Sequence, residues 1–238
     1  MEQKDNILHE KIKQIARQAI DRADLWIKLS HLFKWKNCLE IGVWQGEFAQ
    51  CILENCPTIE RYYLLDPWKN LSDWNKPLNQ DDTIFEAAYQ ETLTRTNFAQ
   101  IKRRILRGRT VEVIHQIENC SLDFIYIDAD HTLRGITIDL INSWHKCNTT
   151  GWIGGDDFCP SIWQHSEAYE PTLIFPYAVY FAEAMSTTIY ALPFDQFIIK
   201  KGNAGFKFID LVDGYQKKTI GEQLKLKQQK SKWYKWRD

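Results

Sequence analysis

The stretch NCLEIGVWQGEFAQCILENC, residues 37–56, decides the fold of this chain. Residues 37–42 form a short apolar run that ends at a glycine, which is typical of a buried strand. Residues 46–56 have the apolar spacing of a helix. Glycines in the turn between them let the chain bend sharply and let a ligand approach the free N–H groups of the helix N-terminus. The stretch therefore predicts a strand–turn–helix unit with a binding turn, although glycine turns without a ligand are also common.

The same alternation continues along the chain. The N-terminal residues 4–32 have helical spacing, with a break near Asp21. Further strands are predicted at 61–66, 102–108, 122–128, 151–158, 188–193 and 196–201, and further helices at 85–98, 110–117, 134–146 and 174–186. Strands that alternate with helices predict a doubly wound α/β fold, mainly parallel, with helices on both faces. The last two strands predict a hairpin that adds an antiparallel edge.

The length of 238 residues suits a single α/β domain, 1–238, in which 1–32 are N-terminal helices. Residues 67–84 hold two prolines, two tryptophans and many turn formers, and we interpret them as a lid-like insertion. Trp68 and Trp74 would then form a wall of a binding pocket or pack against the body of the fold. The basic tail 217–238 is either a solvated end or a contact for an acidic partner or substrate.

Composition excludes several classes of protein. Lys+Arg 30 against Asp+Glu 31 gives a net charge of −1, which argues against a polycation made for nucleic acid. We expect no membrane span, because the chain has no run of eighteen apolar residues, and no secretory signal, because the N-terminus is charged. Six cysteines without a CxxC pair predict free thiols in a reducing cytoplasm. The apolar N-terminal helices could pack against a second copy, so a homodimer is a further expectation.

The glycine turn carries a first indication of the ligand. Its spacing, Glu40-x-Gly42-x-x-x-Gly46, lacks the GxGxxG that seats a pyrophosphate, which favours a ligand without one. Asp66 ends the second strand, twenty-six positions after Glu40, where an acid can accept hydrogen bonds from two ribose hydroxyls. The alternative is that Asp66 serves only as a cap or turn residue.

This pattern resembles the class I S-adenosylmethionine-dependent methyltransferases over the core 36–201. The resemblance implies a Rossmann-like, seven-stranded sheet with a reversed last strand. It places Gly42 and Gly46 beside the methionine part of the cofactor, with Glu40 supporting their loop. It further implies that Asp66 holds the ribose, that Asp128 also contacts the cofactor, and that Gly108 and Thr110 lie against adenine.

Carboxylates follow two predicted strands. Asp128 and Asp130 end one strand, and Asp156 and Asp157 end the next. The carboxyl ends of such strands share one edge of the sheet. Three of these carboxylates, Asp128, Asp156 and Asp157, would repel one another there unless a cation lies among them. Mg²⁺ or another hard divalent cation prefers oxygen ligands. The alternative is that Asp157 caps a helix and Asp128 binds only the cofactor amine.

The segments IDADHTLRG, 127–135, and GGDDF, 154–158, resemble the metal-dependent O-methyltransferases of catechols, caffeoyl-CoA and macrolide sugars. This resemblance implies that Asp128, Asp156 and Asp157 bind the metal. His131 falls where the catechol and caffeoyl-CoA types have a lysine that deprotonates the acceptor. Three residues depart from the family pattern, so the acceptor and adenine contacts are expected to differ: Arg109, Leu133 and Arg134.

These residues predict a methyl transfer to a hydroxyl of a small molecule. Mg²⁺ would lower the hydroxyl pKa, and His131 would act as general base, with Asp130 as the rival base. Two alternatives stay open. The acceptor could be a carboxylate or an amine, including a peptide, methylated without metal. The chain could also be a non-catalytic cofactor-binding interaction module.

Overall fold

The structure is a computed structural model that describes residues 2–166, 168–202 and 205–215. The helices are α1 Glu2–Gln18, α2 Arg22–Phe33, α3 Glu47–Asn55, α4 Asp82–Arg95, α5 Thr110–Val113, α6 Leu133–Lys146 and α7 Ile174–Ala184. The strands are β1 Asn37–Ile41, β2 Arg61–Asp66, β3 Arg103–Arg107, β4 Leu122–Ile127, β5 Cys147–Gly155, β6 Thr188–Leu192, β7 Gln196–Lys200 and β8 Lys207–Asp210. Short 3₁₀ turns lie at Asn97–Ala99 and Ile114–Gln116.

The strands form one sheet in the order β3-β2-β1-β4-β5-β7-β6-β8. Strands β1 to β5 run parallel to one another, and β7 runs antiparallel to both β5 and β6. The predicted α/β fold and its terminal antiparallel hairpin are therefore confirmed. The predicted number of seven strands was too low, because the short strand β8 pairs in parallel with β6 and forms the outer edge. Its sequence, KFID, is too short to signal a strand by periodicity.

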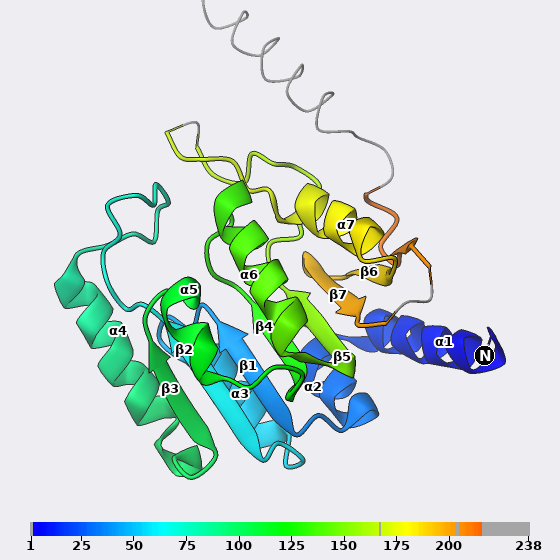
Figure 1. Cartoon of the computed structure of the whole chain (residues 1–238), viewed down its shortest axis with the longest axis horizontal. Helices are drawn as coiled ribbons and strands as arrows, with labels where there is room; N and C mark the ends of the chain where they lie inside the picture. The colour runs from blue at the N-terminus through cyan, green and yellow to red at the C-terminus, as the bar shows by residue number, and fades with distance from the viewer. Residues whose placement is uncertain (1, 167, 203–204, 216–238) are drawn as a thin grey trace, which may run out of the picture.

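Helices cover both faces of the sheet, as predicted (Figure 1). One apolar core packs α1, α2, α3 and α4 against one face, and a second packs α5, α6 and α7 against the other. The central strands β1 and β4 are covered on both sides, which explains why they are apolar almost throughout.

The predicted break in the N-terminal helix lies where expected. Asp21 caps α2 by accepting a hydrogen bond from the Asp24 backbone N–H at 2.8 Å. Trp26 is fully buried, and its ring lies over β5, where a Cβ on Gly154 would come within 2.2 Å of it. Close contact between α2 and the sheet therefore requires glycine at that position.

Residues 67–81 form an irregular connection between β2 and α4, and α4 begins at Asp82, within the predicted insertion 67–84. A lid role for this connection stays a prediction. The basic tail 217–238 lies outside the described residues. In the part of the chain described, none of the helices has the length and apolar character needed to cross a bilayer. All six cysteines are free thiols.

Candidate active site

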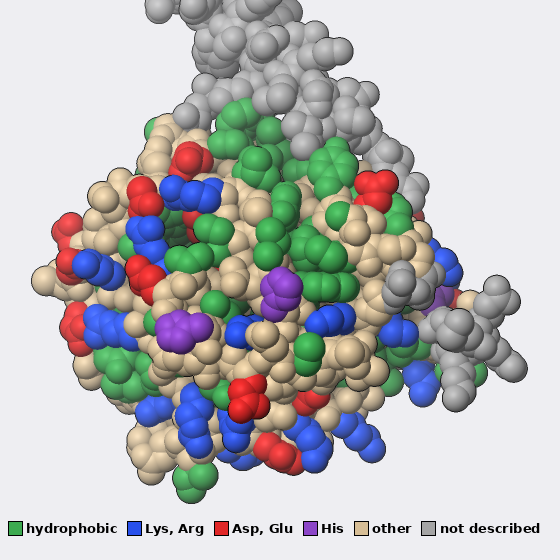
Figure 2. Space-filling view, viewed as in Figure 1, with side chains coloured by type: hydrophobic (Ala, Val, Ile, Leu, Met, Phe, Trp, Pro, Cys, Tyr) green, Lys and Arg blue, Asp and Glu red, His purple; other side chains and the backbone are tan. Residues whose placement is uncertain are grey.

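The carboxyl ends of the central strands open into one cavity of about 530 Å³, a volume typical of small-molecule sites. It lies at the switch point of the sheet, where β1 and β4 are neighbours and the chain has wound outward in both directions. Figure 2 shows this face hollowed between charged side chains. The predicted site residues that line the cavity are Gly42, Asp66, Thr110, Asp128, Asp130, His131, Asp156 and Asp157. Glu40, Gly46 and Gly108 lie behind its wall.

The glycine turn brings the ends of β1 and β4 into contact. Gly42 has a φ of +86°, and a Cβ there would lie 2.0 Å from the carbonyl oxygen of Asp128. Only glycine fits this backbone and this approach. Gly46, with a φ of +75°, starts α3, and a Cβ there would lie 3.0 Å from the Thr92 side chain. Gly46 thus sets the packing of α3 against α4, while Gly42 forms part of the cavity wall.

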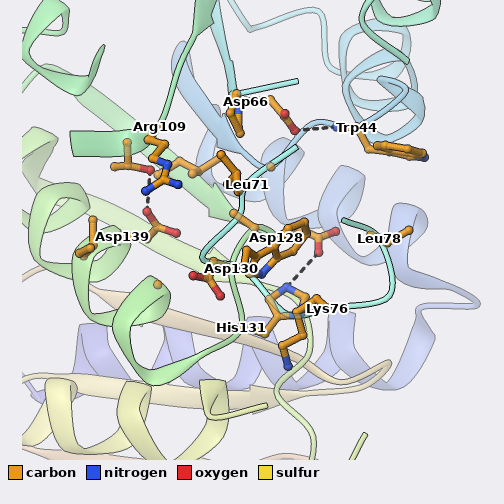
Figure 3. Close-up of a pocket in the computed structure, with 18 of the residues that line it drawn as sticks. Trp44, Asp66, Leu71, Lys76, Leu78, Arg109, Asp128, Asp130, His131 and Asp139 are labelled. Atoms are coloured by element: carbon orange, nitrogen blue, oxygen red, sulfur yellow. Dashed lines mark hydrogen bonds and ion pairs between the residues drawn. The ribbon is translucent and has the colours of Figure 1, made fainter. Parts of the chain in front are cut away.

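Asp66 holds the glycine turn in place. Its Oδ2 accepts hydrogen bonds from the backbone N–H groups of Val43 at 2.8 Å and Trp44 at 3.0 Å (Figure 3). Its Oδ1 accepts one from Trp68 N–H at 2.7 Å. Burial raises the pKa of Asp66, and the three N–H groups oppose this rise. The carboxylate lines the cavity at the end of β2, so a ribose role for it stays a prediction.

Glu40 is buried one layer behind the turn. Its Oε2 accepts a hydrogen bond from the Tyr62 hydroxyl of β2 at 2.8 Å. Burial raises the pKa of Glu40 to about 8, and the Tyr62 contact only partly offsets this. The hydrogen bond of Glu40 is with strand β2 and not with the turn, so its predicted support of the loop stays a prediction.

The turn after β3 meets helix α6 through a buried carboxyl. Thr110 Oγ1 donates a hydrogen bond to Asp139 Oδ1 at 2.6 Å, and both residues line the cavity. Burial raises the pKa of Asp139 to about 7. Gly108 packs against Val113 behind them. The adenine contacts predicted for Gly108 and Thr110 stay predictions, and Asp139 is a wall residue that sequence reasoning missed.

Asp128, Asp156 and Asp157, here called the acid cluster, converge at the ends of β4 and β5. A side-chain cation lies among them. Arg22 of α2 places Nη1 3.1 Å from Asp128 Oδ2 and donates a second, short hydrogen bond to Asp156 Oδ2. Burial and then the charge of Asp128 raise the pKa of Asp156 to about 6, while Arg22 opposes that rise. The arginine thus offsets the repulsion that the sequence indicated.

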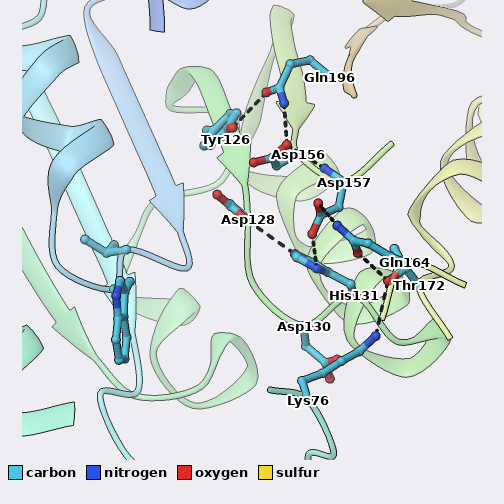
Figure 4. A network of polar contacts seen from close by, with 12 residues as sticks. Lys76, Tyr126, Asp128, Asp130, His131, Asp156, Asp157, Gln164, Thr172 and Gln196 are labelled. Carbon is cyan, nitrogen blue, oxygen red and sulfur yellow. Dashed lines mark hydrogen bonds and ion pairs between the residues drawn. The ribbon is translucent and has the colours of Figure 1, made fainter. Parts of the chain in front are cut away.

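The oxygens of Asp156 and Asp157 are already engaged by protein groups (Figure 4). Asp156 Oδ1 accepts from the Gln196 side chain and the Asp157 backbone N–H, and Asp156 Oδ2 accepts from Arg22. Asp157 accepts from Gln164 through Oδ1 and contacts His131 through Oδ2. A divalent ion needs carboxylate oxygens that point toward it with free lone pairs. These contacts therefore do not fit a Mg²⁺ ion shared by Asp128, Asp156 and Asp157, the ligand set that the sequence predicts.

His131 lies between two carboxylates. Its Nδ1 contacts Asp157 Oδ2, and its buried Nε2 lies 3.5 Å from Asp128 Oδ1, too far for a well-formed hydrogen bond. Asp128, His131 and Asp157 each have one atom of a kind that binds metal ions, and these three atoms lie within 4.8 Å of one another. Burial alone would lower the pKa of His131, but the two carboxylates outweigh it and raise the pKa to about 10. The two carboxylates therefore favour the protonated form of the ring.

The insertion 67–81 is tied across the cavity mouth. Asp73 forms a two-pronged ion pair with Arg109, and Arg134 donates to the Asp73 carbonyl oxygen at 2.8 Å. Lys76 Nζ donates to the Glu170 carbonyl oxygen at 2.8 Å on the opposite loop. Arg109 and Arg134, the two arginines that depart from the family pattern, therefore both contact Asp73 of the insertion.

The two tryptophans of the insertion have different places. Trp68 is buried against Tyr89, with ring centroids 5.0 Å apart, and does not line the cavity. Trp74 does line it. Lys76, missed by sequence reasoning, is buried beside Asp130 and Asp157, and burial lowers its pKa.

Comparison with known proteins places these features in a family. Residues 39–158 match the family model described as a methyltransferase domain. No curated protein matches the sequence. Three solved structures illustrate the shared fold. A Staphylococcus aureus protein assigned as a caffeoyl-CoA O-methyltransferase is 18% identical, with a TM-score of 0.59 over 77% of this chain and 85% of that one.

The second structure, an O-methyltransferase from Bacillus cereus in complex with SAH, is 17% identical, with a TM-score of 0.55 over 80% of this chain and 88% of that one. The third, TomG from Streptomyces achromogenes in complex with SAM, is 13% identical, with a TM-score of 0.54 over 82% and 89%. At such identities these structures bear on the fold alone. The family model covers half of the chain, and it matches the segment that carries the glycine turn and the acid cluster. The chain therefore belongs to the class I S-adenosylmethionine-dependent methyltransferases.

Proposed function

We propose that this protein transfers the methyl group of S-adenosylmethionine to a hydroxyl group of a small molecule. The observation that carries the proposal is the single cavity at the switch point. It joins the Gly42 turn and Asp66, which suit the cofactor, to His131 and Asp130, which suit proton transfer. Its volume of about 530 Å³ suits a cofactor with a compact acceptor rather than a macromolecule.

The reaction is an in-line displacement at the sulfonium carbon. The acceptor oxygen forms a bond to the methyl carbon as the carbon–sulfur bond breaks, and S-adenosylhomocysteine leaves. Orientation of the two reactants supplies on the order of 7–11 kcal/mol. The insertion 67–81, tied by Asp73 to Arg109, would exclude water and hold the acceptor in line.

The hydroxyl proton needs an acceptor on the protein. His131 and Asp130 both line the cavity, and Asp130 Oδ1 is fixed by the Thr132 backbone N–H at 3.0 Å. We assign the base to His131 in its neutral form. Because its pKa is raised to about 10, the neutral fraction rises tenfold per pH unit between pH 7 and pH 9.

The test is a product assay at several pH values. Purified protein is incubated with labelled S-adenosylmethionine and a panel of phenols, sugar alcohols, carboxylic acids and amines, and the methylated products are identified by mass spectrometry. The proposal expects a methyl ether, a rate that rises from pH 7 to pH 9, and loss of that rise in His131→Asn. A methyl ester formed at a rate independent of pH would instead establish a carboxylate acceptor, which needs no base.

A further inference from the structure

We propose that the Arg22 guanidinium is the resident cation of the acid cluster and takes the place of a divalent metal ion. On this view methyl transfer by this chain needs no added metal. The inference rests on the proposed function for the identity of the reaction, whereas its claim about the cation stands on geometry. Arg22 acts as a positioning residue, because it orients Asp128 and Asp156 rather than touching the methyl group.

The position of the guanidinium is the first argument. One nitrogen, Nη1, bridges a carboxylate at the end of β4 and a carboxylate at the end of β5. A metal ion shared by Asp128 and Asp156 would need that same space. The Arg22 guanidinium carbon also lies 5.7 Å from the centre of the Phe48 ring of α3, so an aromatic face further stabilises the charge there.

The second argument is that the helix carrying Arg22 is fixed. Trp26 lies one turn further along α2, on the same face, and is fully buried. Its Nε1 donates to Gln196 Oε1 at 2.7 Å, and the Gln196 amide in turn donates to Asp156. Tyr126 donates to the same Gln196 oxygen at 2.9 Å. Arg22 and its partner Asp156 are thus connected to buried side chains of α2 and the sheet by one continuous set of hydrogen bonds, which fixes their positions.

Charge is the third argument. The acid cluster has three carboxylates, and the positive charge of Arg22 lies between two of them, Asp128 and Asp156. A divalent ion placed between the same two carboxylates would lie against the guanidinium and would be repelled by its positive charge. A metal ion shared by Asp128 and Asp156 and this arginine are therefore alternatives and not partners.

The experiment measures Mn²⁺ binding by electron paramagnetic resonance, which requires no acceptor. Wild type, Arg22→Gln, the double variant Arg22→Gln with Asp156→Asn, and a control, Arg17→Gln on the exposed side of α1, are compared. We expect wild type and control to bind Mn²⁺ weakly and equally. Arg22→Gln should bind at least about tenfold more tightly, because three carboxylates then face a gap. The double variant should lose that gain.

Two results would overturn the inference. One is tight Mn²⁺ binding by wild type that Asp156→Asn abolishes, and the other is unchanged binding in Arg22→Gln. If Arg22→Gln fails to fold, the wild-type titration still decides, and Arg22→Lys, which keeps the charge, should bind Mn²⁺ as weakly as wild type. Calorimetry with S-adenosylhomocysteine in EDTA separates the two proposals. Absence of that binding refutes the proposed function, whereas the Mn²⁺ results judge only the role of Arg22.

Discussion

Substitution of Gly42 by alanine tests how the two central loops form the cofactor wall. The residue has a φ of +86°, which costs a residue with a side chain about 1–2 kcal/mol. The new Cβ would lie 2.0 Å from the Asp128 carbonyl oxygen and 2.7 Å from the Ala129 Cα, both backbone atoms that cannot rotate away. Overpacking of this kind adds about 1–3 kcal/mol. The total of about 2–5 kcal/mol corresponds to a Tm lower by roughly 5–20 °C for a chain of this length.

The assay combines thermal unfolding with calorimetric titration of S-adenosylhomocysteine. We expect Gly42→Ala to remain folded at 20 °C and to bind the ligand at least about tenfold more weakly, since the ends of β1 and β4 must separate. Gly202→Ala is the matched control, because a Cβ there meets nothing within 4 Å. If Gly42→Ala matched that control in both Tm and affinity, the contact between the two loops would have no role in the site.

Three further changes have defined outcomes. Asp66→Asn leaves one oxygen for three backbone N–H groups. Tm should therefore fall by an amount equivalent to about 1–3 kcal/mol for each N–H group left unpaired. An unchanged Tm would show that Asp66 does not hold the glycine turn in place. The pKa of Glu40 is about 8 in the folded chain, against an ordinary value of 4.5. Because the folded chain binds this proton more tightly than the unfolded chain, the free energy of unfolding falls as pH rises from about 4.5 to 8. Glu40→Gln should remove that fall in urea unfolding at pH 5, 6.5 and 8, and parallel pH profiles of variant and wild type would refute it. Asp73→Ala removes the carboxylate ion pairs with Arg109 and Arg134 and keeps only the Arg134 hydrogen bond to the Asp73 backbone carbonyl. Stopped-flow measurements should then show faster ligand release with little change in Tm, and high salt should have the same effect on the wild type. An unchanged release rate would contradict a lid role for the insertion.

The fold could be predicted because its signals are local. The strand at 122–127 is an apolar run of six residues, and the turn at Gly42 is marked by a glycine at the end of another short apolar run. Such runs, separated by helical segments, predict the alternation of strands and helices. The carboxylates were predicted to converge because parallel strands end at one edge. Strand β8 was missed, since four residues give no usable period.

The remaining site residues could not be predicted because their partners are distant in sequence. Arg22 lies 106 positions from Asp128 and 134 from Asp156, and a single arginine at a helix start has no motif. The sequence indicates that a cation lies in the acid cluster. It favours a metal ion, because no pattern in the sequence shows that Arg22 comes close to these aspartates. Asp139 did leave a signal, since it is a carboxyl three positions after Ile136 and therefore on the apolar face of the helix.

The most direct test of the whole account is a calorimetric titration of wild-type protein with S-adenosylhomocysteine in buffer containing EDTA. The account predicts saturable binding to one site, unchanged when EDTA is replaced by Mg²⁺, because Arg22 already supplies the cation. Binding that appears only after Mg²⁺ is added, or no binding under either condition, would contradict it.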